Sequence, residues 1–429
     1  MKKLANDFIN FSHSSKSVFH AVKNTADILI SNGYKEIFES EKWNLEISGK
    51  YFFKKNHSSL LAFSIGNGKL NECGFKISGN HTDSPGFRIK PNPEMVGDSY
   101  LRLNTEVYGG PILNTWLDRP LSIAGRVVVK SENVFKPKTI LVNIDKPCLI
   151  IPNLAIHQNR EVNKGVELNK QNDTLPILTL INDELEKENF LLKIIAEKNN
   201  IDINEILDFD LYLYEFEKGT LVGLNEEMIS ASKIDNLGAL YVGLEAFIES
   251  ENFNGVNVLA CFDNEEVGSS TKQGADSNML LNTLDRISLS LELNREEFFC
   301  ALSNSFMLSV DGAHAVHPSQ KQKTDPIIRP KMNHGVALKV TANQSYTSDA
   351  HSLAVVKQIL EPNGIPYQYF VNRSDTPGGS TIGPISSTHL DINAVDLGLA
   401  MIAMHSIREL CGVKDLTNLK KLLKNYYSL

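Results

Sequence analysis

Acidic side chains and a histidine follow three apolar, strand-like runs of this sequence. The runs and the residues that follow them are 74–78 with His81 and Asp83, 256–262 with Asp263, Glu265 and Glu266, and 306–310 with Asp311. In open α/β sheets, functional groups gather where strands end and loops begin. One acid after a strand is common, but this many acids after successive strands indicate a metal cluster.

The pair His81 and Asp83 has a spacing that suits a metal ligand and its support. In an extended segment, side chains two residues apart point the same way. The His81 imidazole could therefore bind a metal while Asp83 accepts its other N–H, which fixes the tautomer and the ring angle. Alone, the pair is also typical of a histidine beside an acid in a surface turn.

Glu265 and Glu266 are adjacent and directly follow an apolar run. At a strand end, adjacent side chains point in opposite directions, so one carboxylate can bind a metal while the other faces a water molecule. Metal-assisted hydrolysis needs this division between a ligand and a general base. A solvated acidic turn is the alternative interpretation, and the apolar strand before the pair argues against it.

Asp235 and Asp311 are two further candidate ligands. Asp235 precedes a helical pattern, and its two carboxylate oxygens could each take a metal, although a plain helix N-cap is the alternative. Asp311 is followed by His314 and His317. We expect at most one of these two histidines to line the site, because both also suit an ordinary loop.

These candidates lie within an alternation of helices and apolar strands. Helical periodicity covers residues 6–37, 237–249, 280–291 and 351–360, and strand-like runs cover 51–53, 60–63, 74–78, 256–262, 306–310, 336–340 and 367–371. Such alternation predicts an α/β sandwich with a mixed or mostly parallel sheet.

Residues 85–224 differ from the segments on either side in their pattern of turns and short strands. Prolines and glycines separate short β-rich pieces such as 121–129 and 139–143, and a charged, helical stretch follows at 182–199. Breaks of this kind mark turns between short strands. We therefore predict one domain formed by residues 1–84 and 225–429, and a second domain inserted at 85–224.

Length and composition are those of a soluble globular protein. A chain of 429 residues exceeds one ordinary core. A formal net charge of −8 argues against a general nucleic-acid binder, which needs a basic surface. The five cysteines are scattered and odd in number, which suits buried, reduced thiols. Without a signal-like or membrane-spanning apolar stretch, we expect a cytoplasmic enzyme or binding protein with no membrane partner.

Six motifs in a fixed order carry a specific resemblance. They are NHTDSP at 80–85, KIDNLG at 233–238, DNEEVGS at 263–269, DGAHAVHP at 311–318, DTPGGSTIGP at 375–384 and AMHSIRE at 403–409, with SVFHAV at 17–22 in the first helix. Together they resemble the aspartyl aminopeptidase family, which includes the vacuolar aminopeptidase I type. The resemblance spans essentially the whole chain and implies a three-layer α/β/α catalytic domain with a mixed sheet and an inserted β-rich domain.

The resemblance implies a site with two divalent ions, Zn²⁺ with Mn²⁺ or Co²⁺ as alternatives. Its five ligands would be His81, Asp235, Glu266, Asp311 and His405, with Asp235 bridging, His81 and Asp311 on one ion, and Glu266 and His405 on the other. Glu265 would be the general base, and Asp83 would support His81. Three ligand carboxylates and a bridging hydroxide balance the four positive charges. Without the resemblance, His405 would be interpreted as a core histidine in an apolar helical run at 397–410.

The resemblance also bears on the substrate and on assembly. Lys339 and Tyr346 would lie near the substrate, and a cation there favours peptides that begin with Glu or Asp. The inserted domain would mediate dimerisation within a tetrahedral dodecamer. His157 would reach a neighbouring subunit's site to stabilise an oxyanion.

Three other functions stay open at this point. A broad or leucine-type aminopeptidase would share the chemistry but not the pocket. A two-metal amidohydrolase acting on N-acyl amino acids would accept blocked amines. A non-catalytic peptide-binding protein would have no need of a base at Glu265 beside the metal pair.

Overall fold

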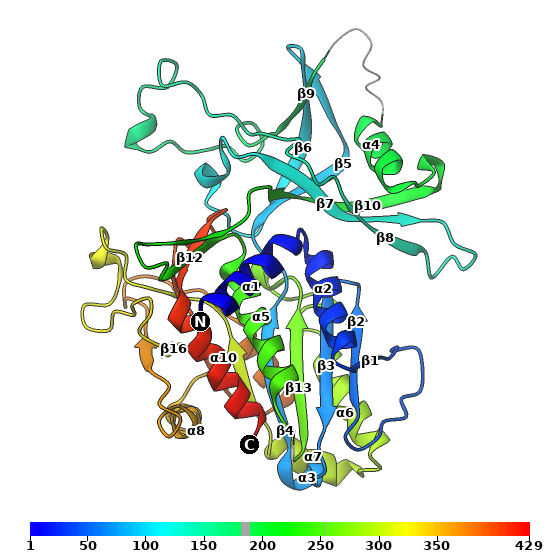
Figure 1. The fold of residues 1–429 in the computed structure, drawn as a ribbon, viewed down its shortest axis with the longest axis vertical. Helices are drawn as coiled ribbons and strands as arrows, with labels where there is room; N and C mark the ends of the chain where they lie inside the picture. Colours follow the sequence, from blue (N-terminus) through cyan, green and yellow to red (C-terminus); the bar gives the residue numbers. More distant parts are fainter. Residues whose placement is uncertain (182–188, 253) are drawn as a thin grey trace.

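The computed structural model describes residues 1–181, 189–252 and 254–429, and its larger sheet has nine strands (Figure 1). Their order is β1 (Lys35–Glu36), β2 (Lys50–Lys55), β3 (Ser59–Ile65), β13 (Val256–Phe262), β4 (Phe75–His81), β14 (Phe306–Val310), β18 (Asn393–Gly398), β16 (Val336–Lys339) and β17 (Tyr367–Phe370). Strands β13, β4, β14 and β18 are parallel to one another, whereas β3 and β16 are antiparallel to their neighbours β13 and β18. The sheet is therefore mixed, as predicted.

Helices cover both faces of this sheet, because the strands are apolar on both sides. Leu60 and Ala62 of β3 join the core on one face, and the alternate residues Leu61 and Phe63 join the core on the other. The first core contains α1 (Lys2–Ser14), α2 (Val18–Ser31), α5 (Ile234–Glu249), α8 (Ala350–Leu360) and α10 (Val413–Tyr427), and the second contains α6 (Met279–Ser290), α7 (Arg295–Ser303) and α9 (Ile382–Leu390). The three-layer α/β/α arrangement is confirmed.

A second sheet of six antiparallel strands forms the upper part of Figure 1. Its order is β8 (Lys138–Asn143), β7 (Leu121–Val129), β10 (Ile206–Glu215), β5 (Gly86–Gly97), β6 (Tyr100–Tyr108) and β9 (Ile177–Leu180). One hydrophobic core lies against it and includes Leu191 and Ile195 of α4 (Phe190–Asn199). The chain thus leaves the α/β part after β4 and returns to it after this sheet, which we call the inserted sheet.

A third sheet of five short strands positions the last candidate ligand. Its order is β11 (Thr220–Val222), β12 (Met228–Ala231), β20 (Glu409–Gly412), β19 (Ala400–Ile402) and β15 (Ala313–His314). His405 lies in the turn between β19 and β20, with a φ of 68°. The helix predicted over 397–410 is therefore wrong. The apolar residues of this range lie instead on the paired strands β19 and β20 and on the end of β18.

Two other helix predictions need correction. The helix predicted over 6–37 is two helices that are interrupted at Ser15–Ser17, where the Ser15 N–H bonds to the Phe11 carbonyl. Serine competes for backbone hydrogen bonds and so favours helix ends, which explains the break. The second helix ends at Ser31, and β1 follows within the predicted range. The helix predicted over 182–199 is described only from Phe190, and residues 182–188 lie outside the described part of the chain.

All five cysteines are free, as the sequence predicts, but only Cys261 and Cys411 are buried. Among the described residues, no helix is both long and apolar enough to span a bilayer.

Candidate active site

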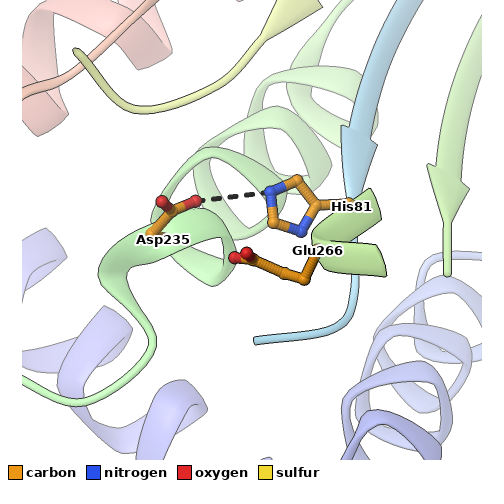
Figure 2. Close-up of side chains that lie close together, drawn as sticks. All are labelled: His81, Asp235 and Glu266. Carbon is orange, nitrogen blue, oxygen red and sulfur yellow. Dashed lines mark ion pairs between the residues drawn. The ribbon is translucent and has the colours of Figure 1, made fainter. Parts of the chain in front are cut away.

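Three candidate ligands from distant parts of the chain meet at one edge of the nine-stranded sheet (Figure 2). His81 ends β4, Asp235 lies at the start of α5, and Glu266 lies in the turn η4 (Glu265–Val267) that follows β13. Strands β4 and β13 are parallel and in register, with Phe262 opposite His81, so their carboxyl ends coincide. One ligand atom from each of the three residues lies within 4.8 Å of the others.

His81 is held with one ring nitrogen toward its own chain and the other toward the acids. Its Nδ1 lies 3.1 Å from the carbonyl oxygen and 3.3 Å from Oδ1 of Asp83. Both of these oxygens accept, so Nδ1 carries a hydrogen and Nε2 is the ring nitrogen left for the acids or for a metal ion. Nε2 faces Asp235 Oδ1 at 3.3 Å and Asp311 Oδ1 at 3.5 Å.

His405 is arranged in the same way on the other side of Asp235. Its Nδ1 lies 3.1 Å from the carbonyl oxygen of Gly110, so this nitrogen also carries the hydrogen. Its Nε2 faces Asp235 Oδ2 at 3.6 Å and Glu266 Oε2 at 3.4 Å. Asp235 therefore turns one carboxylate oxygen toward each histidine.

This donor set fits metal ions. In a tetrahedral zinc site with metal–ligand distances of about 2.0–2.1 Å, the ligand atoms are about 3.3–3.4 Å apart. The separations of 3.3 to 3.6 Å between each Nε2 and its carboxylate neighbours match that spacing. In the described part of the chain, the buried Asp235 Oδ1 and Glu266 Oε1 lack a hydrogen-bond partner. Nitrogen and oxygen donors without cysteine suit zinc, and also Mn²⁺ or Co²⁺.

The electrostatics of the cluster favour added positive charge. Burial raises the pKa of Glu265 to about 7, with His81 opposing the rise and Asp311 and Asp235 adding to it. Burial and Asp235 raise the pKa of Glu266 well above its usual range. Burial alone would lower the pKa of His81, but the nearby carboxylates of Asp235 and Asp311 raise it well above the usual value. Each of these pKa shifts favours the protonated side chain, and bound metal cations can supply the same positive charge.

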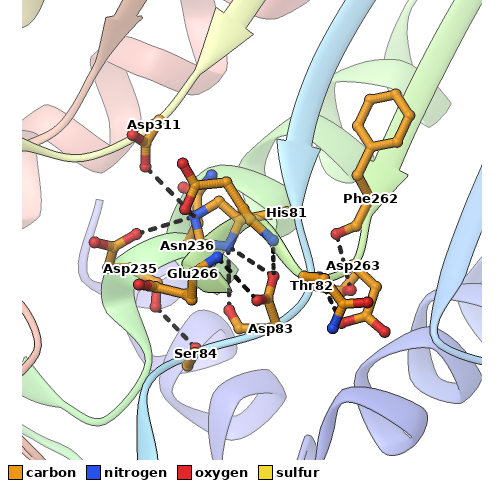
Figure 3. Close-up of polar contacts among 12 residues, drawn as sticks. His81, Thr82, Asp83, Ser84, Asp235, Asn236, Phe262, Asp263, Glu266 and Asp311 are labelled. Atoms are coloured by element: carbon orange, nitrogen blue, oxygen red, sulfur yellow. Dashed lines mark hydrogen bonds and ion pairs between the residues drawn. The ribbon is translucent and has the colours of Figure 1, made fainter. Parts of the chain in front are cut away.

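Asp83 contacts two candidate ligands, His81 and Glu266, which lie around it in Figure 3, and also the candidate base. Its Oδ1 accepts the backbone N–H of Glu265 at 3.2 Å, and its Oδ2 accepts the N–H of Glu266 at 3.1 Å. Oδ1 also faces His81 Nδ1. Asp83 thus holds the ring of one candidate ligand and the backbone of the turn that carries another, which extends the role predicted from its spacing.

A cleft beside the cluster brings in the other predicted residues except His317 and His157. It is lined by Glu265, Glu266, Asp235, Asp311, His405, Lys339, Tyr346 and His314, together with residues of the 379–381 loop. His317 is not among the lining residues. Nor is His157, which is exposed on a turn of the inserted region. Within one chain, the site therefore forms without His157.

Lys339 lies at the floor of this cleft with only 2% of its side chain exposed. Its Nζ lies 3.0 Å from Asp311 Oδ2 and 5.2 Å from the centre of the Tyr346 ring. Burial works against the charged form, but Asp311 and Tyr346 outweigh it and raise the pKa of Lys339. Lys339 is thus a cation held in a fixed position, and its ammonium group is already paired with Asp311.

Two supporting residues were not predicted from the sequence. The buried Glu409 accepts the backbone N–H groups of Asp235 at 2.9 Å and of His405 at 2.7 Å. The Tyr108 hydroxyl donates to Asp83 Oδ2 at 2.7 Å. Glu409 is the last residue of the motif at 403–409, and this was the only feature of the sequence that linked it to the site. No pattern around Tyr108 pointed to the site.

A model of the family described as aminopeptidase I zinc metalloprotease (M18) matches residues 8–427. The chain belongs to the M18 family. This M18 chain is 57% identical over 428 residues to the probable M18 family aminopeptidase 2 of Clostridium novyi, covering 100% of this chain and 99% of that protein. The chain described here is therefore a metalloaminopeptidase, a hydrolase of peptide bonds.

Solved structures of similar proteins share the fold of this M18 chain. The complex of Ape4 and Nbr1 contains a chain that is 36% identical, with a TM-score of 0.95 over 100% of this chain and 86% of that one. The mature Ape1 dodecamer of S. cerevisiae contains a chain that is 26% identical, with a TM-score of 0.86 over 99% of this chain and 96% of that one. The resemblance to the family of vacuolar aminopeptidase I is confirmed.

Proposed function

We propose that this M18 protein is a two-metal aminopeptidase that removes N-terminal residues, preferentially Glu and Asp, from peptides. The observation that carries the proposal is Asp235, whose two oxygens face the Nε2 atoms of two different histidines. A carboxylate in that position suits a bridge between two ions. Asp311 beside His81 and Glu266 beside His405 would complete the two sites.

Glu265 is proposed as the general base. Its carboxylate lines the cleft, is 16% exposed, and has Oε2 3.9 Å from His81 Nε2. Two divalent ions, when bound, supply Lewis acidity that activates a water and polarises the scissile carbonyl. Glu265 would then accept a proton from the attacking water and deliver it to the amine of the departing peptide.

The preference for acidic residues is proposed from Lys339 and Tyr346. Lys339 supplies the positive charge in the cleft, and its position over the Tyr346 ring keeps the ammonium group in place. A substrate carboxylate there would gain a charge-assisted hydrogen bond, which a leucine side chain cannot form. Because Asp311 already pairs with Lys339, we expect a preference rather than absolute selection.

Self-association is proposed through the inserted domain, residues 85–224. Its loops expose the apolar side chains of Leu154 and Ile156, which precede the exposed His157. A similar chain forms a dodecamer in S. cerevisiae mature Ape1. We propose dimers that build a tetrahedral dodecamer, with His157 reaching a neighbouring active site, and a cytoplasmic location.

The test is a panel of Glu-, Asp-, Leu- and Lys-arylamides, each with and without an N-acetyl block. The zinc-loaded protein should cleave the free Glu and Asp substrates fastest. Glu265→Gln should lower kcat by about 10²- to 10⁴-fold without loss of zinc, because only proton transfer is removed. Faster cleavage of Leu or Lys substrates would overturn the pocket assignment, and cleavage of blocked substrates would indicate an amidohydrolase.

A further inference from the structure

The end of strand β6 in the inserted sheet touches the candidate metal centre. Tyr108 is the last residue of β6, and its hydroxyl donates to Asp83 Oδ2 at 2.7 Å. The Tyr108 hydroxyl oxygen in turn accepts from the side-chain amide of Asn264 at 2.9 Å. Asn264 directly precedes Glu265. Tyr108 therefore bonds to Asp83 after strand β4 and to Asn264 after strand β13.

The residues after Tyr108 reach the second histidine. The carbonyl of Gly110 accepts from His405 Nδ1 at 3.1 Å, and the N–H of Ile112 donates to the His405 carbonyl at 2.9 Å. Gly109, between Tyr108 and Gly110, has a φ of +66°, and a Cβ added there would lie 3.2 Å from Glu266 Cβ. At Gly109 the segment therefore passes so close to Glu266 that a side chain would crowd it.

We infer that residues 108–112 are a built-in support of the metal centre, with Tyr108 a positioning residue for His81 through Asp83. Without the Tyr108 hydroxyl, Asp83 Oδ2 would keep only the N–H of Glu266. The carboxylate could then rotate away from His81 Nδ1, and the Asn264 amide would lose its acceptor. Both histidine sites would thus depend on how the inserted sheet sits on the α/β part.

The inference rests on the proposed ligand set, and two matched variants test it separately. Tyr108→Phe keeps the ring and removes only the hydroxyl. Tyr212→Phe is the control, because Tyr212 lies in β10 of the same sheet, separated from β6 by β5, with its ring edge-on to that of Tyr108 and the ring centres 6.0 Å apart. Among the described residues, the Tyr212 hydroxyl makes no bond to Asp83 or Asn264.

Zinc affinity, measured by competition with a chromophoric chelator, is the first readout. We expect Tyr108→Phe to weaken it about 10- to 100-fold, as is usual when the partner of a ligand's support is lost, and Tyr212→Phe to change it less than twofold. The kcat of Tyr108→Phe should fall with KM nearly unchanged. The urea midpoint of the metal-free protein should match that of the control.

A double-mutant cycle that combines Tyr108→Phe with Asp83→Asn tests whether Tyr108 acts through Asp83. If Tyr108 acts through Asp83, the losses of the two single variants should not add. Full additivity, or wild-type zinc affinity in Tyr108→Phe, would overturn the inference. His81→Ala reports on the ligand set itself: wild-type zinc affinity in this variant would overturn the proposed function, whatever Tyr108→Phe shows.

Discussion

The two large sheets contribute to the site in different ways. The nine-stranded sheet is covered by helices on both faces, and its strand ends carry His81, Glu265, Glu266 and Asp311. The inserted sheet has one core, exposes apolar residues at its loops, and contributes the Tyr108 hydroxyl and the Gly110 carbonyl.

This difference follows from what each task requires. Side chains that bind metal must be held within a fraction of an ångström, and a sheet packed on both faces gives that rigidity. Supporting hydrogen bonds tolerate a less enclosed scaffold, and exposed apolar loops suit the proposed contact with other subunits. The α/β part thus carries the proposed chemistry, while the inserted sheet supports it and carries the surfaces proposed for assembly.

The largest expected effect comes from removing the shared acid of the α/β part. Asp235→Ala takes one oxygen from each histidine site, so we expect both ions to be lost. The loss of activity should exceed the roughly 10²- to 10⁴-fold loss of a general base alone. Zinc content by mass spectrometry and kcat check this. Asp285→Ala, at a half-exposed acid on α6, is the control. Retention of one zinc per chain would show that Asp235 serves a single site.

A core side chain of the α/β part and a loop side chain of the inserted region should contribute very differently to stability. Phe262 is fully buried in β13, and Phe262→Ala should lower the free energy of unfolding by about 3–5 kcal/mol through the cavity it leaves. Phe135, on the hairpin between β7 and β8, is 95% exposed, and Phe135→Ser should change it by less than about 0.5 kcal/mol. Urea unfolding of the metal-free proteins measures both. Equal losses would contradict the comparison.

Acid should weaken metal binding to the α/β part by a smaller, graded amount. The pKa values of His81, Glu266 and His405 are raised, so the metal-free cluster holds protons near neutral pH that an ion must displace. Zinc affinity should therefore fall as pH falls from 8 to 6, by about tenfold per pH unit for each displaced proton. Calorimetry in two buffers of different ionisation enthalpy counts these protons. An affinity that is flat over this range would contradict the assignment.

Much of the α/β part was predictable because its signals are local. Apolar strands followed directly by His81, Glu265–Glu266 and Asp311 gave both the sheet and the edge where the site would form. The break at Ser15–Ser17 was not predicted, because apolar residues on both sides keep a helical spacing.

The supporting contacts were not predictable because they join distant segments. Tyr108 meets Asp83 only through the path of the inserted sheet, and Gly110 acts through a carbonyl that every residue has. His405 came from the resemblance alone, because a turn between two short strands has the same apolar flanks as a buried helix.

Anomalous X-ray diffraction at the zinc edge, from crystals of the zinc-loaded protein, tests the central claim most directly. The account predicts two peaks on either side of Asp235, one bound by His81 and Asp311 and the other by Glu266 and His405. A single peak, or peaks away from Asp235, would contradict the two-metal centre.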